Sequence, residues 1–237
     1  MTSPTTSFLK RHLFITRSAL ARDPKLLLFN YPFVLWHQYK VMKKGTWESK
    51  REGARASDCW VTKDTELVID GFQGSANSFA TDLFQAAQTR RVDIAHHLHS
   101  PSLIIRGVNL DRPVIVCVRE PIAAVTSLIR RWSHIGPEAG LRSYAGFYSS
   151  LIPYRQKMVI SEFSQTIGGF GEVVEETNER YGTDFEIPDS AGKVALAEPP
   201  DGSKEEKKRV SNLILGDEFE SARNLAMSAY ERFTEKS

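Results

Sequence analysis

An uninterrupted hydrophobic run at residues 113–118, Pro-Val-Ile-Val-Cys-Val, constrains the fold of this chain more than any other feature. The run is short and rich in β-branched residues, which is typical of a buried strand. Because it contains no polar residue, neither face of the strand can be turned to water, and such strands belong to parallel sheets that are covered on both faces. The run therefore predicts a central strand of an α/β fold.

Other segments supply the remaining elements of such a fold. Short apolar runs predict strands at residues 67–69, 92–95 and 158–163, and helical periodicity begins at Phe79. Arg90 and Arg91 are expected to end the helix that begins there, since cations suit a helix C-terminus. Helices are further predicted at residues 122–132, 141–153, 172–181 and 219–233, with Gly182 as a C-cap, a break at 136–140 and a mobile polar loop at 188–206.

Length and composition limit the class of protein. The 237 residues are expected to form a single domain over residues 1–237, with residues 1–60 as a helical N-terminal extension packed on it. A net charge of only +2 provides no whole-protein attraction to nucleic acid. Cys59 and Cys117 form neither a disulfide framework nor a metal-ligand spacing, which favours a reducing, cytoplasmic compartment. No signal peptide is recognised, and no apolar run approaches the roughly 20 residues that cross a bilayer.

The segment after the first predicted strand has the composition of an anion-binding loop. Small and turn-forming residues follow from Gly71 to Ser78, directly before the predicted helix. Unpaired backbone N–H groups and the helix dipole together favour a phosphate or sulfate there. The chain contains no Gly-Lys-Ser/Thr, so this is not the Walker loop of ATPases. An ordinary strand-to-helix turn is the alternative interpretation.

Ionisable side chains follow two other predicted strands. His96, His97 and His99 come after the second strand, where an open α/β sheet places its ligand. No Cys, Asp or Glu stands beside them at ligand spacing, which argues against a metal site. Arg119 follows the hydrophobic strand just before a helix that contains Ser127, a position that favours anion binding.

The loop and the Arg-Glu-Pro segment, in this order, resemble motifs of the sulfotransferases that use 3′-phosphoadenosine 5′-phosphosulfate (PAPS). In that family the first loop reads Pro-Lys/Arg-Ser-Gly-Thr/Asn-Thr/Ser-Trp/Phe, and the matching positions here begin at Gln73. The second motif is Arg-(Asp/Asn)-Pro, then five residues, then Ser, and its Arg and Ser hold the 3′-phosphate. The resemblance, over residues 66–185, thus implies these cofactor-binding residues: Gly74, Ser75, Ala76, Asn77, Ser78, Phe79, Arg119 and Ser127.

The resemblance also implies an architecture and a reaction. The architecture is three-layered and P-loop-like, with a central, mainly parallel sheet flanked by helices. The reaction moves a sulfuryl group from PAPS to a hydroxyl or amine of a small-molecule or glycan acceptor and leaves PAP. The family's catalytic histidine lies between the two motifs, and His97 is nearest the usual spacing, with His99 as the second choice.

Two positions depart from the family pattern. Glu120 replaces the usual Asp or Asn, and Gly74 stands where the family carries the Lys or Arg that stabilises charge on the leaving nucleotide. Three explanations stay open: another cation enters the site, activity is weak, or the protein only binds the nucleotide. A nucleotide kinase is a further alternative. The candidates for the missing cation are Arg90, Arg91, Arg106 and the basic residues of 204–209. The aromatic residues that could line an acceptor pocket are Trp36, Trp47, Trp60 and Phe147.

Overall fold

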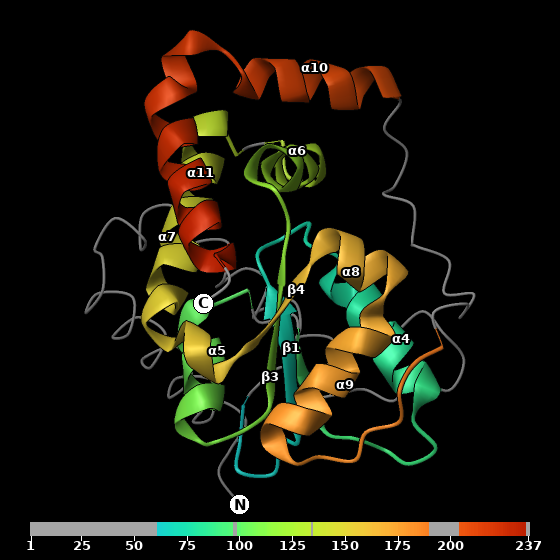
Figure 1. Ribbon diagram of the computed structural model, residues 1–237. Helices are drawn as coiled ribbons and strands as arrows, with labels where there is room; N and C mark the ends of the chain where they lie inside the picture. The colour runs from blue at the N-terminus through green and yellow to red at the C-terminus, as the bar shows by residue number, and fades with distance from the viewer. Residues whose placement is uncertain (1–60, 97–98, 134, 190–203, 236–237) are drawn as a thin grey trace, which may run out of the picture.

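A parallel β-sheet organises the molecule (Figure 1). The computed structural model describes residues 61–96, 99–133, 135–189 and 204–235. Within them a four-stranded sheet has the order β2-β1-β3-β4, and every pair of neighbouring strands is parallel. The strands are β1 (Leu67–Gly71), β2 (Ile94–His96), β3 (Val114–Val118) and β4 (Val159–Glu162). The predicted α/β fold with a parallel sheet is confirmed, and β3 lies between β1 and β4, as its hydrophobicity predicted.

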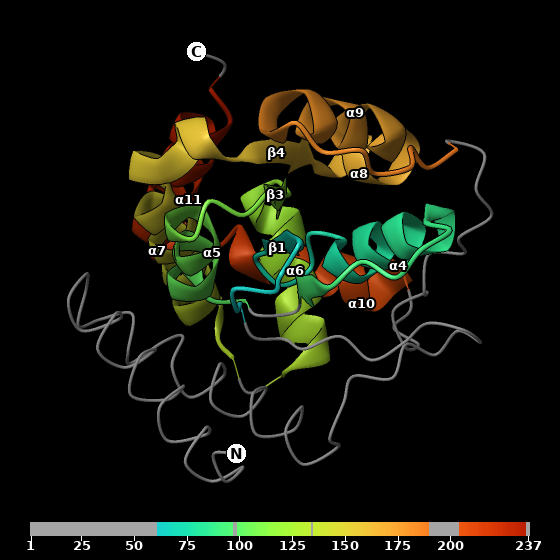
Figure 2. The same cartoon turned by 90° about the horizontal axis from the view of Figure 1, so that it is seen from below.

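Alternate residues of the central strands enter two separate hydrophobic clusters. Val68, Val114 and Val116 point into one cluster, whereas Leu67 and Ile115 point into the other. The first cluster is completed by α5 (Pro101–Asn109), α6 (Pro121–Arg131), α7 (Pro137–Leu151), α10 (Lys204–Ile214) and α11 (Glu220–Thr234). The second is completed by α4 (Asn77–Ala87) and α9 (Phe170–Tyr181), with the short α8 (Phe163–Gly168) beside them. Helices therefore cover both faces of the sheet, as Figures 1 and 2 show.

Several element boundaries differ from the sequence-based expectation. The second strand lies at Ile94–His96 rather than at residues 92–95. The α4 helix begins at Asn77, so Asn77 and Ser78 belong to its first turn. The break expected at 136–140 is shorter, because Pro137 starts α7 at the first helical position, where proline's missing N–H is not needed. The Gly182 C-cap is confirmed, with the left-handed backbone that favours glycine.

The prediction that Arg90 and Arg91 end the first helix is wrong. The α4 helix ends at Ala87, with Gln88 as its C-cap. Arg90 instead forms an ion pair with Glu66, directly before β1, and Arg91 pairs with Asp93, directly before β2. Both arginines therefore lie at the edge of the sheet where strands begin, called here the amino edge.

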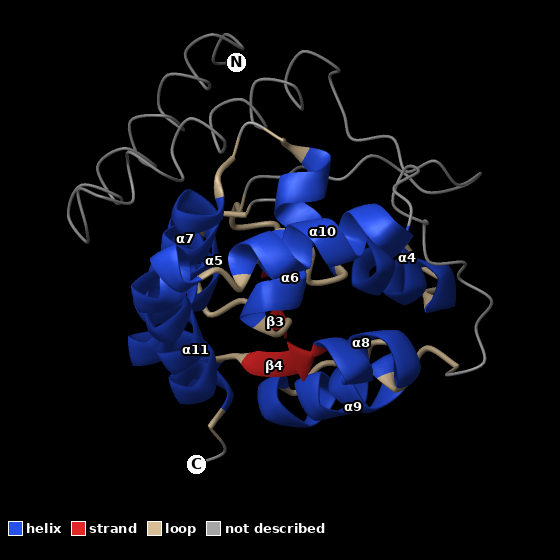
Figure 3. Ribbon diagram, turned by 90° about the horizontal axis from the view of Figure 1, so that it is seen from above, coloured by secondary structure: helices blue, strands red, loops and turns tan. Residues whose placement is uncertain are grey.

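Three helices of the described residues were not predicted. The α5 helix follows β2, the short α8 follows β4, and α10 begins at Lys204, inside the segment expected to be a loop. The α10 helix packs across α6, above the edge of the sheet where β3 ends (Figures 1 and 3). Short 3-10 turns, η1 (Ile152–Lys157) and η2 (Asp217–Phe219), precede β4 and α11.

Some sequence-based expectations fall on other parts of the chain. The helical N-terminal extension, together with Trp36, Trp47 and Trp60, lies outside the described residues, as do residues 190–203. None of the helices in the described ranges is long and apolar enough to cross a membrane.

Candidate functional site

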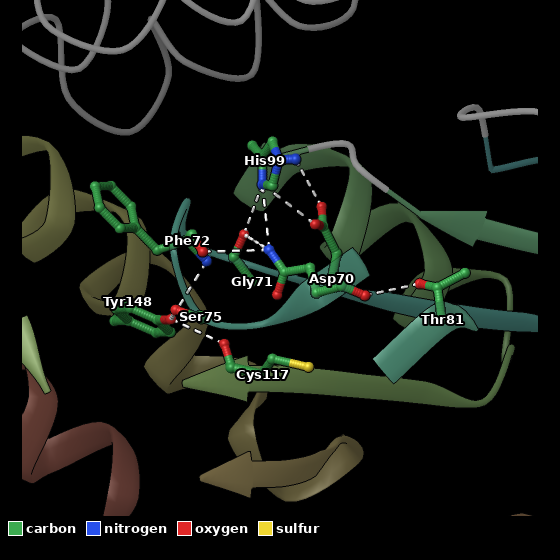
Figure 4. A network of polar contacts seen from close by, with 9 residues as sticks. Asp70, Gly71, Phe72, Ser75, Thr81, His99, Cys117 and Tyr148 are labelled. Carbon is green, nitrogen blue, oxygen red and sulfur yellow. Dashed lines mark hydrogen bonds and ion pairs between the residues drawn. The ribbon is translucent and has the colours of Figure 1, made fainter. Parts of the chain in front are cut away.

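The candidate site lies at the carboxyl edge of the sheet, where β1, β2 and β3 end side by side. The loop of residues 72–76 leaves β1 there and enters α4. The hydroxyl of Tyr148 donates to the Cys117 carbonyl at 2.9 Å and accepts the Phe72 backbone N–H at 3.3 Å. The Ser75 hydroxyl lies 3.4 Å from the same oxygen (Figure 4). One buried hydroxyl on α7 therefore fastens the loop to the end of β3.

The far side of this loop lies against α6. Gly74 has a φ of +85°, and a Cβ at this position would lie 2.9 Å from the Cβ of Ser127 and 3.0 Å from the carbonyl oxygen of Ala124. The guanidinium of Arg119 donates through Nη1 to the Gly74 carbonyl at 3.0 Å. The structure thus brings together the loop, Arg119 and Ser127, which are distant in the sequence.

Arg119 keeps most of its hydrogen-bonding capacity. Its guanidinium carbon stacks 4.0 Å from the centroid of the Phe163 ring, which fixes the plane of the group. Burial lowers the pKa of Arg119 from its ordinary value, but an arginine stays charged. Only one of its five N–H donors meets an acceptor among the described residues, the Gly74 carbonyl. The other donors are available to an anion.

Glu120 has a structural role in this arrangement. Its carboxylate accepts the backbone N–H groups of Ile122 at 3.1 Å and Ala123 at 2.9 Å, and thereby caps α6. The first turn of α6 is therefore already occupied by a negative group. At this end of the site the Arg119 guanidinium and the half-buried Ser127 hydroxyl lie beside the loop.

The first turn of α4 carries no such cap. Its N-cap residue Ala76 adopts a left-handed backbone with φ 67° and makes no side-chain cap hydrogen bond. Asn77 is buried, and its amide donates to the carbonyls of Gly71 at 3.0 Å and Phe72 at 3.2 Å. The Asn77 side chain therefore holds the loop in place, whereas the backbone of residues 76–79, with Ser78 exposed and Phe79 half-buried, is what this turn presents.

His99 lies on the other side of the loop, within reach of the end of β1. Its Nδ1 is 2.9 Å from the Gly71 carbonyl and 3.4 Å from the Asn77 amide nitrogen. Its backbone N–H donates to Asp70 Oδ2 at 2.6 Å, and Asp70 Oδ1 is 3.5 Å from Nδ1 (Figure 4). Burial lowers the pKa of His99 to about 4, with the charge of Arg131 acting in the same direction. His99 is therefore neutral at physiological pH.

The other two histidines are placed differently. His96 is the last residue of β2 and is buried in the sheet, in register with Ile69. His97, the first choice for the catalytic base, lies outside the described residues. Among the described residues no group of three or more His, Cys, Asp or Glu side chains is arranged to hold a metal ion.

Three of the cations considered as substitutes for the missing loop Lys or Arg lie far from the loop. Arg90 and Arg91 are held at the amino edge, as described above. Arg106 is in the last turn of α5 and donates to the carbonyl of Val61, before β1, so it too lies at the amino edge. The basic residues of 204–209 lie on α10, whose Glu206 pairs with Arg130 of α6 at 3.6 Å.

Sequence reasoning missed two residues that build this site, Asp70 and Tyr148. Asp70 carried a usable signal, since it is the only charged residue in an otherwise apolar strand. Tyr148 carried none, because its partners are far from it in the sequence. Phe147, considered for an acceptor pocket, is fully buried against the ring of Phe72 at 5.9 Å and belongs to the core.

The fold and this edge define an α/β protein whose parallel strands end at a candidate anion-binding loop. Comparison of the chain with protein-family models, with curated proteins and with solved structures gave no match in any of the three.

Proposed function

We propose that the protein is a PAPS-dependent sulfotransferase, which moves a sulfuryl group to a hydroxyl or amine of a small-molecule or glycan acceptor. The observation that supports this most is the contact of Gly74 with both Arg119 and Ser127. In the sulfotransferases that the sequence resembles, the first loop and the Arg…Ser pair hold opposite ends of one nucleotide. In this protein the loop at Gly74 lies against Arg119 and Ser127, and a nucleotide held by both would require this closeness.

Each part of the site has a chemical role in this proposal. Backbone N–H groups of Gly74 and of residues 76–78, together with the dipole of α4, hold the 5′-phosphosulfate, because the N-cap residue Ala76 makes no side-chain cap; the Ser75 N–H is bonded to the Phe72 carbonyl. The free donors of Arg119 and the Ser127 hydroxyl hold the 3′-phosphate. The Phe163 ring keeps the guanidinium in one plane, which favours bidentate contact with a phosphate.

His99 is the described residue suited to accept the proton. A carbonyl oxygen can only accept, so the 2.9 Å contact with Gly71 places a hydrogen on Nδ1 and the lone pair on Nε2. As the acceptor oxygen or nitrogen bonds to sulfur, its proton passes to Nε2. The bond from sulfur to the bridging oxygen breaks, and PAP leaves with that electron pair. Positioning and charge stabilisation supply most of the catalysis.

A second candidate function is nucleotide binding without efficient transfer. It is favoured by Gly74, whose position against α6 leaves no room for the cationic side chain usual in the family. Loss of one such donor is expected to cost on the order of 10²–10³ in rate. A binding protein of this kind would retain the contacts to both ends of the nucleotide.

A thermal-shift comparison of PAP, PAPS and ATP tests the shared part of both proposals. PAP and PAPS should raise the melting temperature, whereas ATP, which lacks the 3′-phosphate, should not. Arg119→Ala should abolish the shift, and Arg91→Ala, a control that removes an exposed arginine at the amino edge, should preserve it. Stabilisation by ATP alone would instead favour a nucleotide kinase.

A transfer assay separates the two candidates. Radiolabelled PAPS is incubated with the protein and a broad panel of hydroxyl and amine acceptors. Label transfer that is lost in His99→Gln, with PAP binding retained, supports the enzyme. Tight PAP binding without transfer to any acceptor supports the binding protein, and no binding of PAP or PAPS overturns both.

A further inference from the structure

We infer that Asp70 is a positioning residue that fixes His99 through its backbone amide and favours the protonated ring, while the Gly71 carbonyl keeps the hydrogen of the neutral ring on Nδ1. This inference rests on the proposed function for its catalytic meaning. The tautomer and the titration of the ring are properties of the protein alone, so they can be measured without any substrate.

Asp70 is unusual in its surroundings. It is fully buried near the end of β1 and is the only carboxylate among the buried side chains of the described residues. Its neighbours in the strand are apolar, and on β3 it lies in register with Val116. Removing a carboxylate from water costs several kcal/mol unless it gains strong partners, so an apolar residue would serve packing better here. The burial of this charge therefore calls for an explanation in the site.

The contacts of Asp70 supply that explanation. One oxygen, Oδ2, accepts the backbone N–H of His99 at 2.6 Å, and the other, Oδ1, lies 3.5 Å from the imidazole Nδ1. His99 has a φ of 46°, a left-handed conformation that costs a residue with a side chain about 1–2 kcal/mol. A short, charge-assisted hydrogen bond to the His99 amide stabilises this conformation and sets the position of the ring.

The hydrogen on the imidazole follows from the neighbouring groups. The Gly71 carbonyl can only accept, so Nδ1 must donate to it at 2.9 Å. The Asn77 amide cannot donate to Nδ1 in its place, because its two hydrogens are directed to the carbonyls of Gly71 and Phe72. Asp70 Oδ1 is a second acceptor on the Nδ1 side. The two oxygen neighbours of Nδ1, from Gly71 and Asp70, thus agree on a proton at Nδ1.

Charged and titratable groups around His99 keep it neutral until the reaction. Burial is the main cause of its low pKa, and Arg131, in the last turn of α6, adds to the effect. On β3, burial together with the charge of Asp70 raises the pKa of Cys117 to about 12, and the same two causes raise the pKa of Tyr148 on α7. The thiol and the phenol are therefore uncharged, and among the described residues Asp70 is the carboxylate that lies against the ring.

Asp70 would act in the transfer through His99. When Nε2 takes the acceptor's proton, a positive charge appears on the imidazole, close to the Asp70 carboxylate. In a buried site this attraction is much stronger than in water. Asp70 therefore favours the protonated ring at the moment of transfer, although it does not itself take the proton.

The substitution Asp70→Asn tests this role at nearly constant shape. The amide oxygen can still accept the His99 N–H, but the NH₂ group then takes the place of Oδ1. The Gly71 carbonyl still accepts from Nδ1 at 2.9 Å, so the Nδ1–H tautomer should persist, but the negative charge beside the ring is lost. We therefore expect the pKa of His99, followed by nitrogen-15 NMR of labelled histidine, to fall below the wild-type value. The control Asp93→Asn removes an exposed carboxylate at the amino edge and should leave the His99 signals unchanged.

Each outcome bears on the inference. Wild-type protein with His99 in the Nε2–H form would overturn it, whether or not the variant folds. So would a folded Asp70→Asn protein in which His99 titrates at the wild-type pKa. In the transfer assay, Asp70→Asn should lower kcat by roughly 10²- to 10⁴-fold while PAP affinity is unchanged. If wild type transfers nothing but shows the Nδ1–H tautomer, and the His99 pKa falls in Asp70→Asn, the proposed function fails and the positioning role stands.

Discussion

Gly74 lies so close to Ser127 that a Cβ at position 74 would be 2.9 Å from the Ser127 Cβ. Non-bonded carbon atoms normally stay about 3.5–4.0 Å apart, so only glycine allows the loop to approach α6 in this way. Arg119 completes the contact by donating to the Gly74 carbonyl. The residue that departs most from the sulfotransferase pattern is therefore the one that joins the two halves of the candidate site.

Gly74→Ala is expected to lower both stability and PAP affinity. The added methyl group meets α6, and the φ of +85° is strained for alanine, so unfolding free energy should fall by about 1–3 kcal/mol. Urea unfolding measures the change. Gly168→Ala is the matched control, since a Cβ there has no neighbour within 4 Å, and it should be neutral or slightly stabilising. Equal stability of the two variants would contradict the close contact.

Ser127→Ala should separate binding from folding. The Ser127 hydroxyl makes no hydrogen bond among the described residues. Removal of this hydroxyl should therefore change the free energy of unfolding by less than about 0.5 kcal/mol. A hydrogen bond to a charged phosphate contributes about 1.5–3 kcal/mol, so PAP affinity should fall roughly 10- to 100-fold. Calorimetric titration measures the affinity. Ser133→Ala, on an exposed turn, should bind normally, and unchanged binding by Ser127→Ala would remove this residue from the site.

Tyr148→Phe should weaken the attachment of the loop to the end of β3. The variant leaves the Cys117 carbonyl and the Phe72 N–H without the phenol oxygen that now joins them. Leaving such buried groups unpaired costs about 1–3 kcal/mol, which denaturant unfolding detects. Tyr154→Phe is the control, because Tyr154 is only partly buried and its hydroxyl makes no hydrogen bond among the described residues. A Tyr148→Phe protein as stable as this control would show that the hydroxyl does not hold the loop.

His99 should make the protein less stable in acid. Its pKa is about 4 in the folded state and near 6.5 when exposed, so between these values the unfolded chain binds a proton that the native protein does not. Stability should therefore fall as pH decreases from about 7 to 4, by up to about 3 kcal/mol from this residue. Unfolding curves of wild type and His99→Gln at pH 7 and 4.5 measure the effect. Identical pH dependence in the two proteins would contradict it.

Parts of the fold were predictable because local patterns reflect burial. The hydrophobic run of β3 has to be covered on both faces, and it is. The α5 helix was missed because it is short and contains Gly107, which weakens a helical pattern. That glycine has a tertiary reason, since a Cβ on it would lie 2.8 Å from Val68 on β1.

The residues of the candidate site also fall into two groups, those that the sequence could indicate and those that only the tertiary structure brings together. Motif spacing selected the loop, Arg119, Ser127 and the histidines, because each follows the end of a strand. It could not select Asp70 as the partner of His99, or Tyr148 as the anchor of the loop. Those pairs are 29 and 76 residues apart, and they meet only because of strand order and helix packing.

The amino-acid sequence by itself indicated the four strands and most of the helices beside them, since periodicity and turn chemistry are local properties. Only the tertiary structure decided that Gly74 is pressed against Ser127, that Arg90, Arg91 and Arg106 lie at the amino edge, and that Asp70 faces His99. The physical reason is that neighbours across a sheet depend on the order and register of strands, which the packing of the whole molecule sets.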